Sequence, residues 1–371
     1  MSSLLIRKAE FYNFRNYNHL EFQPSAGINF LTGENGSGKS NLIEGLYYFC
    51  FSRSFRTFRE REIIHWGEHE AGARLLFRVG SKNQEMKISW EKNIEGNIQK
   101  RLQVGNYTCK KASEFIGHAV MVLFSPGDLE IVNGPPGRRR KFLDIITTMI
   151  TPAHISDLSD YRQILLERNR LLTSGEYDQD QMSVWTEKLV EYGSKILYRR
   201  LSVLKMLKEH IRKVSSRLEY PISDLSVKYL GSFPIPEDEK LIPLDFRKAL
   251  DETSTEEKEK MATVVGPHRD ELLIRLANKP ARIFGSQGQQ RMIAIILKIS
   301  QAELLADKTG IVPLLLLDDC LSELDMKRQK QLWREISSSG QVIITSGHHP
   351  PEWVPGDNLT IFEIKGGRLK R

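Results

Sequence analysis

The first third of the chain alternates hydrophobic and polar residues with a period of two, the spacing of side chains along a β-strand. This alternation runs from residue 4 to residue 30 and returns between residues 74 and 132. A cluster of glycine and proline at residues 133–137 ends it. The pattern predicts a sheet-rich region at the start of the chain.

Beyond this break, the spacing of hydrophobic residues becomes helical. Residues 155–172 and 184–215 predict two helices that fold back on each other through the polar link 173–181. The second helix carries a wide hydrophobic stripe, which is typical of a core-facing surface. The stripe consists of Trp185, Leu189, Tyr192, Ile196, Leu197, Leu201, Val203, Leu204 and Met206. We therefore expect a helical hairpin or a small bundle.

The segments after this hairpin are expected to lead back into a sheet. The proline-containing residues 221–245 are predicted to be rich in loops, and residues 251–260 are predicted to form a charged helix on the solvated surface. Residues 341–345 are predicted to form the last core strand, and residues 359–364 a strand of a terminal hairpin. Strands at both ends and helices between them predict an α/β fold with a helical insertion.

A glycine-rich motif connects the apolar strand 28–32 to the apolar helix 42–51. Residues 33–40 read GENGSGKS and match GxxxxGK[ST], in which backbone N–H groups and a helix N-terminus bind phosphate. Lys39 is expected to reach the β- and γ-phosphates, and the Ser40 hydroxyl to bind Mg²⁺. The expected nucleotide-binding residues are Gly33, Glu34, Asn35, Gly36, Ser37, Gly38, Lys39, Ser40 and Asn41. This motif predicts a nucleoside triphosphate site, and an ordinary glycine-rich turn is the weaker alternative.

An apolar strand that ends in two carboxylates provides a second motif. Residues 311–317 contain four consecutive leucines and have the character of a strand buried on both faces of a parallel sheet. Acids at the end of such a strand are costly unless a cation binds there, so Asp318 is interpreted as the Mg²⁺ partner of Ser40. Asp319 is then expected to polarise the water that attacks the γ-phosphate. The alternative is an edge strand followed by an acidic turn.

A third motif opens the apolar helix 292–305. It is similar to the LSGGQ signature of ABC-type ATPases, in which a serine and helix N-terminal amides contact the γ-phosphate held by the opposite subunit. The residues expected to make this contact are Ser286, Gln287, Gly288 and Gln289. Ser322 and Asp325, which follow the second motif, are expected to lie in a D-loop at the dimer seam.

The spacing of these motifs predicts how the domains are organised. About 250 residues separate the first and third motifs. This gap is wider than in transporter subunits and is similar to that of SMC-like DNA ATPases, in which a helical arm is inserted into one head. We therefore expect residues 1–135 and 262–371 to form an ABC-type ATPase head, a P-loop fold with a mixed sheet flanked by helices. Residues 136–261 are expected to form the smaller helical domain.

The composition favours a polyanionic partner and a reducing compartment. The 54 Lys and Arg exceed the 47 Asp and Glu, for a formal net charge of +7. The three cysteines lack CxxC spacing and indicate neither a disulfide framework nor a zinc site. The apolar part of the N-terminus is too short for a signal peptide, and no apolar run approaches about 20 residues. A cytoplasmic protein outside the membrane is expected.

Two basic clusters are candidate contacts to DNA phosphates, which would give affinity without base readout. The first is a run on a predicted Pro-Gly loop and consists of Arg138, Arg139, Arg140 and Lys141. The second is interleaved with Phe55 and Phe58 and consists of Arg53, Arg56, Arg59 and Arg61. Intramolecular ion pairs and contacts to the nucleotide are the alternatives. His268 and Arg269 either face phosphates or brace the loop before the signature.

The combined motifs resemble the bacterial RecF family over essentially the whole chain. The strings that carry the resemblance are FRNY at 14–17, SNLIE at 40–44, FSP at 124–126, RRRKFLD at 138–144, GPHRD at 266–270 and GSQGQQR at 285–291. The family uses an aspartate at position 319, where transporters have a glutamate. A transporter-type histidine would fall near Ser346, whereas this chain has His348 and His349. Residues 126–128 occupy the approximate place of the glutamine lobe contact.

The resemblance implies an ATP- and Mg²⁺-dependent homodimer that binds gapped DNA at single-/double-strand junctions. It also implies slow, DNA-stimulated ATP hydrolysis, action with RecO and RecR in loading RecA, and roles in DNA replication and the SOS response to DNA damage. An ATP-gated clamp that acts mainly by binding, with no essential turnover, is the alternative. A transport-associated ATPase is disfavoured by the inserted arm.

Overall fold

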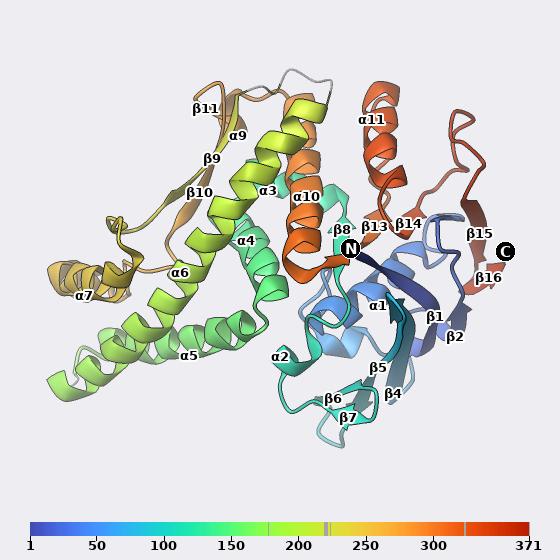
Figure 1. The fold of residues 1–371 in the computed structure, drawn as a ribbon. Coiled ribbons are helices and arrows are strands. Elements are labelled where there is room, and N and C mark those ends of the chain that lie inside the picture. Colours follow the sequence, from blue (N-terminus) through green and yellow to red (C-terminus); the bar gives the residue numbers. More distant parts are fainter. Residues whose placement is uncertain (177, 219–221, 223, 323, 371) are drawn as a thin grey trace. The chain divides into compact units, whose positions relative to one another are not determined.

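The computed structural model describes residues 1–176, 178–218, 222, 224–322 and 324–370 (Figure 1). The chain divides into two compact units, Met1–Asp128 with Ala294–Arg371 and Leu129–Ile293. The division into compact units falls at residues 128/129 and 293/294, whereas the sequence led us to expect a helical domain over residues 136–261. Residues 129–135 and 262–293, which include the signature motif, also belong to the second unit.

The first unit contains a sheet whose central strand precedes the glycine-rich loop. Its order is β16-β15-β3-β14-β13-β8, and all neighbours are parallel except β15 and β16. The bounds are β3 Ile28–Thr32, β8 Met121–Phe124, β13 Leu314–Asp318, β14 Val342–Thr345, β15 Leu359–Lys365 and β16 Arg368–Lys370. Because β3, β14 and β13 are parallel neighbours, their carboxyl ends share one edge. The glycine-rich loop and the two acids therefore meet there.

A second sheet of the first unit is mainly antiparallel and accounts for the alternating pattern at the start of the chain. Its order is β12-β1-β4-β5-β6-β7, and β2 pairs with β1. The bounds are β1 Ser2–Phe14, β2 Tyr17–Phe22, β4 Glu70–Val79, β5 Lys82–Lys92, β6 Ile98–Val104, β7 Tyr107–Thr108 and β12 Ile311–Val312. Pro313 separates β12 from β13, so the apolar run 311–317 serves both sheets.

Helix α1 (Lys39–Phe51) contacts strands of both sheets of the first unit. On one side, Tyr48 lies edge-on to Phe14 and to Trp90, with ring centroids 6.3 Å and 5.1 Å apart. A Cβ added at Gly45 would lie 2.3 Å from the Phe11 ring, so only glycine allows this approach. The unit also contains three short helical elements, η1 Glu60–Glu62, α2 Ala112–Phe115 and η2 Pro126–Asp128, and the longer helix α11 Met326–Ser337.

The second unit contains the predicted helical hairpin. Helices α5 (Ala153–Ser174) and α6 (Gln179–Arg217) pack against each other and are joined by a link shorter than the expected 173–181. At 39 residues, α6 is about 58 Å long. The other helices are α3 Leu129–Asn133, α4 Pro136–Ile150, η3 Glu239–Leu241, α7 Ile242–Glu252, α8 Ser254–Lys260 and α9 Ala281–Phe284.

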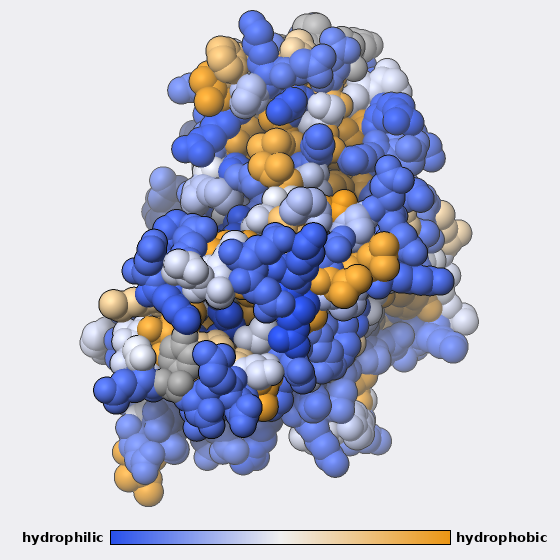
Figure 2. All heavy atoms as spheres, turned by 90° about the vertical axis from the view of Figure 1, so that its left-hand side faces the viewer, coloured by the Kyte–Doolittle hydropathy of each residue, from blue (hydrophilic) through white to orange (hydrophobic). Residues whose placement is uncertain are grey.

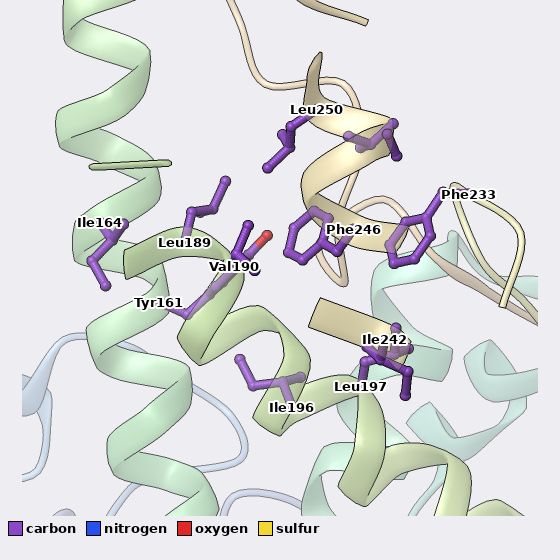
Figure 3. Packing of buried hydrophobic residues seen from close by; sticks show 12 residues of the cluster. Tyr161, Ile164, Leu189, Val190, Ile196, Leu197, Phe233, Ile242, Phe246 and Leu250 are labelled. Carbon is purple, nitrogen blue, oxygen red and sulfur yellow. The ribbon is translucent and has the colours of Figure 1, made fainter. Parts of the chain in front are cut away.

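The core of this unit lies where α5, α6 and α7 meet (Figure 3). Leu189, Ile196 and Leu197 of the predicted stripe are fully buried there. Phe246 of α7 stacks on Phe233 with ring centroids 5.1 Å apart and an interplanar angle of 4°. The stripe was therefore correctly interpreted as a core face.

The region expected to be a loop-rich return contains regular structure. Strand β9 (Leu225–Leu230) pairs with β10 (Glu271–Leu276), which pairs with β11 (Lys279–Pro280). Helix α7 also begins within this region. Residues 221 and 223 lie outside the described residues. The second unit is therefore not purely helical, because it contains the three-stranded sheet β11-β10-β9.

The segment 251–260, expected to be a charged helix on the solvated surface, is mostly exposed, but it is divided between two helices and one of its acids is buried. The chain turns at Thr253 between α7 and α8, and Glu257 of α8 is 1% exposed. Its carboxylate accepts a hydrogen bond of 2.6 Å from Arg168 of α5, which is also buried. Arg168 further donates to the hydroxyl groups of Thr186 and Thr263. A buried, fully hydrogen-bonded ion pair thus joins α8 to the hairpin.

The surface is predominantly polar on the face shown in Figure 2, where hydrophobic residues occur in small groups. Among the described helices, none has the combination of length and apolar content that spanning a lipid bilayer requires.

Substituting Glu257 tests the buried pair. Glu257→Ala is expected to lower the free energy of unfolding by about 3–5 kcal/mol, because it leaves the Arg168 charge buried without a partner. The measurement is urea denaturation followed by circular dichroism. Glu256→Ala is the matched control, since Glu256 pairs with Lys260 on the exposed side of the same helix, and its effect should stay within about 0.5 kcal/mol. Equal effects of the two substitutions would contradict this account.

Candidate nucleotide-binding site

The glycine-rich loop has a backbone that its glycines alone permit. Gly33, Gly36 and Gly38 have φ angles of 147°, 81° and 120°, which side chains disfavour. A Cβ at Gly33 would lie 2.3 Å from the carbonyl oxygen of Ile364, and one at Gly38 would lie 2.9 Å from the Tyr17 hydroxyl. The loop is therefore shaped by both conformation and close packing. Glu34, Asn35 and Gly36 at its tip are exposed.

Side chains from the turn between β1 and β2 hold this loop. Phe14 pairs with Tyr17, so the turn consists of Arg15 and Asn16. The Tyr17 hydroxyl donates to the Gly38 carbonyl at 2.6 Å. Burial raises the pKa of Tyr17, so the hydroxyl keeps its proton. The Asn16 amide donates to the carbonyl of the buried Ser37 at 3.2 Å. The sequence showed these residues only as part of a family string.

The other residue of the turn is anchored to α1. Arg15 donates to both carboxylate oxygens of the fully buried Glu44, at 2.9 Å and 2.6 Å. Arg56 lies 3.5 Å from the same carboxylate and donates to the Asn41 side chain at 2.7 Å. Asn41 in turn donates to Asn16 at 2.8 Å. A continuous set of hydrogen bonds therefore links residue 56 to the glycine-rich loop.

Lys39 points back into the loop that it follows. Its ammonium group donates to the carbonyls of Gly33 and Glu34 at 2.6 Å and 2.9 Å. Burial lowers the pKa of Lys39, against the opposing influence of the carboxylates of Asp319 and Asp318. The lysine is thus held by two neutral acceptors, which a phosphate group could replace.

Ser40 and Asp318 meet at the edge of the parallel sheet. The Ser40 hydroxyl donates to Asp318 Oδ1 at 2.8 Å, and the Thr345 hydroxyl donates to the same oxygen at 2.8 Å. Asp318 is 8% exposed. A hydroxyl and a carboxylate are oxygen ligands of the kind that Mg²⁺ takes beside phosphates, so the residues present fit the ion that the motif predicts.

Asp319 is oriented differently from its neighbour. Its backbone is left-handed, with φ of 49°, and its amide is hydrogen-bonded to Thr345. This turn takes Asp319 out of the strand and leaves it exposed, whereas Asp318 stays buried. The two acids therefore have distinct surroundings.

The segment after β14 lies beside the glycine-rich loop. A Cβ at Gly347 would lie 3.8 Å from the Asn35 side chain. Ser346 is buried and accepts a hydrogen bond from the backbone of His348, and both His348 and His349 are exposed. These residues are placed near the tip of the loop, without a histidine at position 346.

A charge pair between the half-buried Asp128 and the buried Lys298 lies at the segment that was expected to take the approximate place of the glutamine lobe contact. The Asp128 carboxylate accepts the Ser125 amide at 2.7 Å and lies 3.8 Å from the Lys298 ammonium. Burial raises the pKa of Asp128 and lowers that of Lys298, while the partner charge opposes both shifts. Sequence patterns gave no signal for Lys298, because it lies among hydrophobic residues of a helix.

The signature motif caps α10 (Gln287–Thr309). The Ser286 amide donates to the Gln289 side chain at 2.9 Å, and the Gln289 amide donates to the Ser286 hydroxyl at 3.2 Å. Ser286 and Gln287 are exposed, and Gly288 and Gln289 are half-buried. Gln290 is buried and donates to three backbone carbonyls. The cap thus presents a fixed helix N-terminus to solvent.

The expected D-loop residues also have local roles. The Ser322 hydroxyl donates to the Asp319 carbonyl at 2.8 Å. Asp325 is the N-cap of α11 and accepts the Arg328 amide at 3.0 Å. Residue 323 lies outside the described residues. These hydrogen bonds fix both ends of the turn that follows the two acids.

The basic run 138–141 lies on α4 and not on a loop. Arg139 is 5% exposed and makes a bidentate pair with Glu271 at 2.8 Å and 2.7 Å, so its expected contact with DNA is corrected to an internal ion pair. Arg138 pairs with Glu130 at 2.5 Å, and Arg140 donates to the Asp270 carbonyl at 2.7 Å. Lys141 is half-buried. The intramolecular alternative therefore describes most of this cluster.

The GPHRD string braces its own loop. The Tyr161 hydroxyl lies 2.7 Å from His268 Nδ1, and His268 Nε2 lies 3.2 Å from the Thr263 carbonyl. Because a carbonyl only accepts, Nε2 carries the proton and Nδ1 accepts from Tyr161. Arg269 also donates to the Thr263 carbonyl. Burial lowers the pKa of His268 to about 4, so the ring is neutral at pH 7.

This fold and this constellation of loop, acids and capped helix define an ABC-type ATPase head, as predicted. The family model "RecF/RecN/SMC N terminal domain" matches residues 5–351. Proteins named DNA replication and repair protein RecF from Streptococcus suis and Clostridium novyi are 34% and 33% identical, over 98% and 99% of this chain and 98% and 100% of their own.

Solved structures agree. The recombination mediator protein RecF-ATPrS in the RecFOR pathway is 32% identical, with a TM-score of 0.90 over 99% of this chain and 98% of that one. An Smc head bound to the C-winged helix domain of ScpA has the same fold, with a TM-score of 0.54 at 16% identity over 99% of this chain and 97% of that one. The chain belongs to the RecF family.

Acid titration tests the His268 brace. The pKa of His268 is about 4 in the folded protein, against 6.5 for an ordinary histidine. Between these values the unfolded chain binds the additional proton, so the free energy of unfolding should fall as the pH drops from about 6.5 to about 4. At 1.36 kcal/mol per pKa unit, the loss is about 3 kcal/mol.

The matched variants are His268→Asn, whose amide oxygen can still accept from Tyr161, and His69→Asn at an exposed position. Urea denaturation at a series of pH values should show a smaller acid dependence for His268→Asn alone. If its pH dependence matches that of the wild type, His268 is not the group responsible.

Proposed function

We propose that this protein is an ATP-dependent DNA-binding ATPase of recombinational gap repair and DNA replication. The observation that carries the proposal is the meeting of Ser40 and Asp318 at 2.8 Å, 278 residues apart in the chain, beside a loop whose glycines have backbone conformations that side chains disfavour. This donor set suits a triphosphate with its divalent cation. The named function of relatives that match nearly the whole chain supports the DNA-repair role.

The chain's own residues have distinct tasks at the triphosphate. Lys39 exchanges two backbone carbonyls for phosphate oxygens, while Ser40 and Asp318 hold Mg²⁺. When bound, Mg²⁺ neutralises charge on the phosphates. Asp319, exposed beside this site, accepts a hydrogen bond from the attacking water. Tyr17 and Asn16 keep the loop in the shape that binds phosphate.

Dimerisation completes the site. The exposed N-terminus of α10, with Ser286 already fixed by Gln289, suits contact with the γ-phosphate held by a second copy. ATP therefore joins two copies, and slow hydrolysis separates them. The dimer encloses DNA at a single-/double-strand junction and acts with RecO and RecR to load RecA. The solved relatives described as recombination mediators in the RecFOR pathway support this assignment.

Sedimentation velocity with ATP, with ADP and without nucleotide tests the proposal directly. The wild type should form dimers with ATP only. Lys39→Arg and Ser286→Arg should both abolish this association. Only Lys39→Arg should weaken ATP binding to a single copy, by about ten-fold or more, because the larger planar guanidinium cannot take the position of the compact ammonium group inside the loop. A mass that is independent of nucleotide would overturn the proposal.

Substituting Asp319 separates turnover from binding. Asp319→Asn should retain ATP-driven association but hydrolyse ATP at least about a hundred-fold more slowly, since the amide accepts a water proton poorly. If hydrolysis resets the dimer, this variant should also dissociate from a labelled DNA junction more slowly than the wild type. Unchanged dissociation would favour a clamp that acts by binding alone.

A further inference from the structure

An unusual pair of aromatic rings lies on the segment that follows α1. Phe58 and Trp66 are 93% and 95% exposed. Single exposed hydrophobic residues are common on protein surfaces, so what distinguishes these rings is the backbone that carries them and the charges beside them. Phe55, by contrast, packs against Tyr47 of α1 with ring centroids 5.4 Å apart. The exposure is therefore a property of two particular rings.

This exposure does not result from a loosely attached loop. The backbone of the segment is hydrogen-bonded to the β1–β2 turn, from Arg15 to the Ile63 carbonyl and from His65 to the Asn13 carbonyl, at 2.7 Å each. Glu60, within the turn η1, is paired with Lys100 of β6. The two rings thus lie on either side of a fixed stretch of backbone, and their Cα atoms, eight residues apart, are at most about 28 Å from each other.

Within residues 53–66, the charged side chains that lack an ion-pair partner among the described residues are basic, whereas an exposed carboxylate, Glu68, lies two residues beyond Trp66. Arg53 and Arg61 are exposed, and neither forms an ion pair with a carboxylate of the described residues. Arg59 is 70% exposed and lies 4.0 Å from Glu62, at the limit of an ion pair. Cationic side chains beside bare aromatic rings match a ligand that carries both phosphates and accessible base faces.

We propose that residues 53–66 form a binding platform for unpaired bases of single-stranded DNA. Phe58 and Trp66 each stack on a base, and Arg53 and Arg61 neutralise phosphates of the same DNA strand. Duplex DNA is excluded as the ligand of the rings because its base faces are already stacked. The platform rests on the proposed DNA function and assigns to this segment the single-stranded arm of a junction.

The same segment is connected to the nucleotide site. Arg56 donates to Asn41, which is bonded to Asn16 beneath the glycine-rich loop. Single-stranded DNA bound at the two rings would therefore contact a segment that is hydrogen-bonded, through Asn41 and Asn16, to the loop that holds the triphosphate.

Two matched double variants test the platform. Phe58→Ala with Trp66→Ala removes both rings, whereas Phe58→Tyr with Trp66→Phe keeps two aromatic faces. Fluorescence anisotropy with a labelled oligothymidine should show binding about ten-fold weaker for each ring lost, and near wild-type binding for the ring-retaining variant. Binding of a blunt duplex should change in neither variant. Wild-type tryptophan fluorescence should be quenched by oligothymidine, and this quenching should be lost in Trp66→Phe.

Arg53→Gln with Arg61→Gln tests the phosphate contacts. The slope of log affinity for oligothymidine against log salt should become shallower by about 0.7 for each contact removed. An unchanged slope would remove these arginines from the platform.

The outcomes separate the platform from the proposed function. If the alanine variant binds oligothymidine as the wild type does, or if duplex binding falls equally, the platform is wrong while the DNA function stands. If the alanine variant instead loses ATP-driven dimerisation, the rings are a contact between copies and the platform is also wrong. If the wild type binds neither oligothymidine nor duplex DNA, whether with ATP, with ADP or without nucleotide, the proposed function itself is overturned.

Discussion

The nucleotide site depends on a glycine-rich loop whose backbone is hydrogen-bonded by side chains of another sheet. The carbonyls of Ser37 and Gly38 in the glycine-rich loop accept side-chain hydrogen bonds in addition to backbone ones from Gly367 and from the start of α1. Asn16, in the β1–β2 turn of the other sheet, and Tyr17, the first residue of β2, supply the side-chain donors. The antiparallel sheet is therefore more than a scaffold beside the site. Its first turn fixes the conformation on which phosphate binding depends.

The buried carboxylate of Glu44 connects helix α1 to the turn that supports the glycine-rich loop. Glu44 lies in the second turn of α1 and binds Arg15 of the same β1–β2 turn through both oxygens. The start of α1 and the support of the loop are thus joined by a charged pair shielded from water, where such pairs tolerate the loss of a partner poorly. Arg56 extends the connection outward to the exposed segment after α1. Helix α10 belongs to both units, because it begins at the signature in the second unit and continues into the first.

The sequence patterns identified features whose signals are local. The glycine-rich loop, the leucine strand and the helical hairpin each follow from spacing within a few residues, and the structure contains all three. The run 138–141 was misplaced because the Pro-Gly pair was interpreted as a helix breaker, whereas proline is favoured at the first position of a helix and α4 begins at Pro136.

Features that arise from distant contacts could not be predicted in this way. Glu257 lies in a string of charges that resembles a solvated helix, and its burial depends on Arg168, 89 residues away. Lys298 and Asp128 are likewise paired only in the folded chain. Strand β9 escaped detection since its stability comes from pairing with β10, about 45 residues later, and not from its own pattern.

The central claim is that each ATP site needs the loop of one copy and the signature of another. Mixing two inactive variants tests it most directly, because Ser286→Arg keeps an intact loop and Lys39→Arg keeps an intact signature. The account predicts that ATP hydrolysis, absent from either variant alone, reappears in an equimolar mixture, where one intact site forms per mixed pair. Full hydrolysis by Ser286→Arg alone, or a mixture no more active than its separate components, would contradict it.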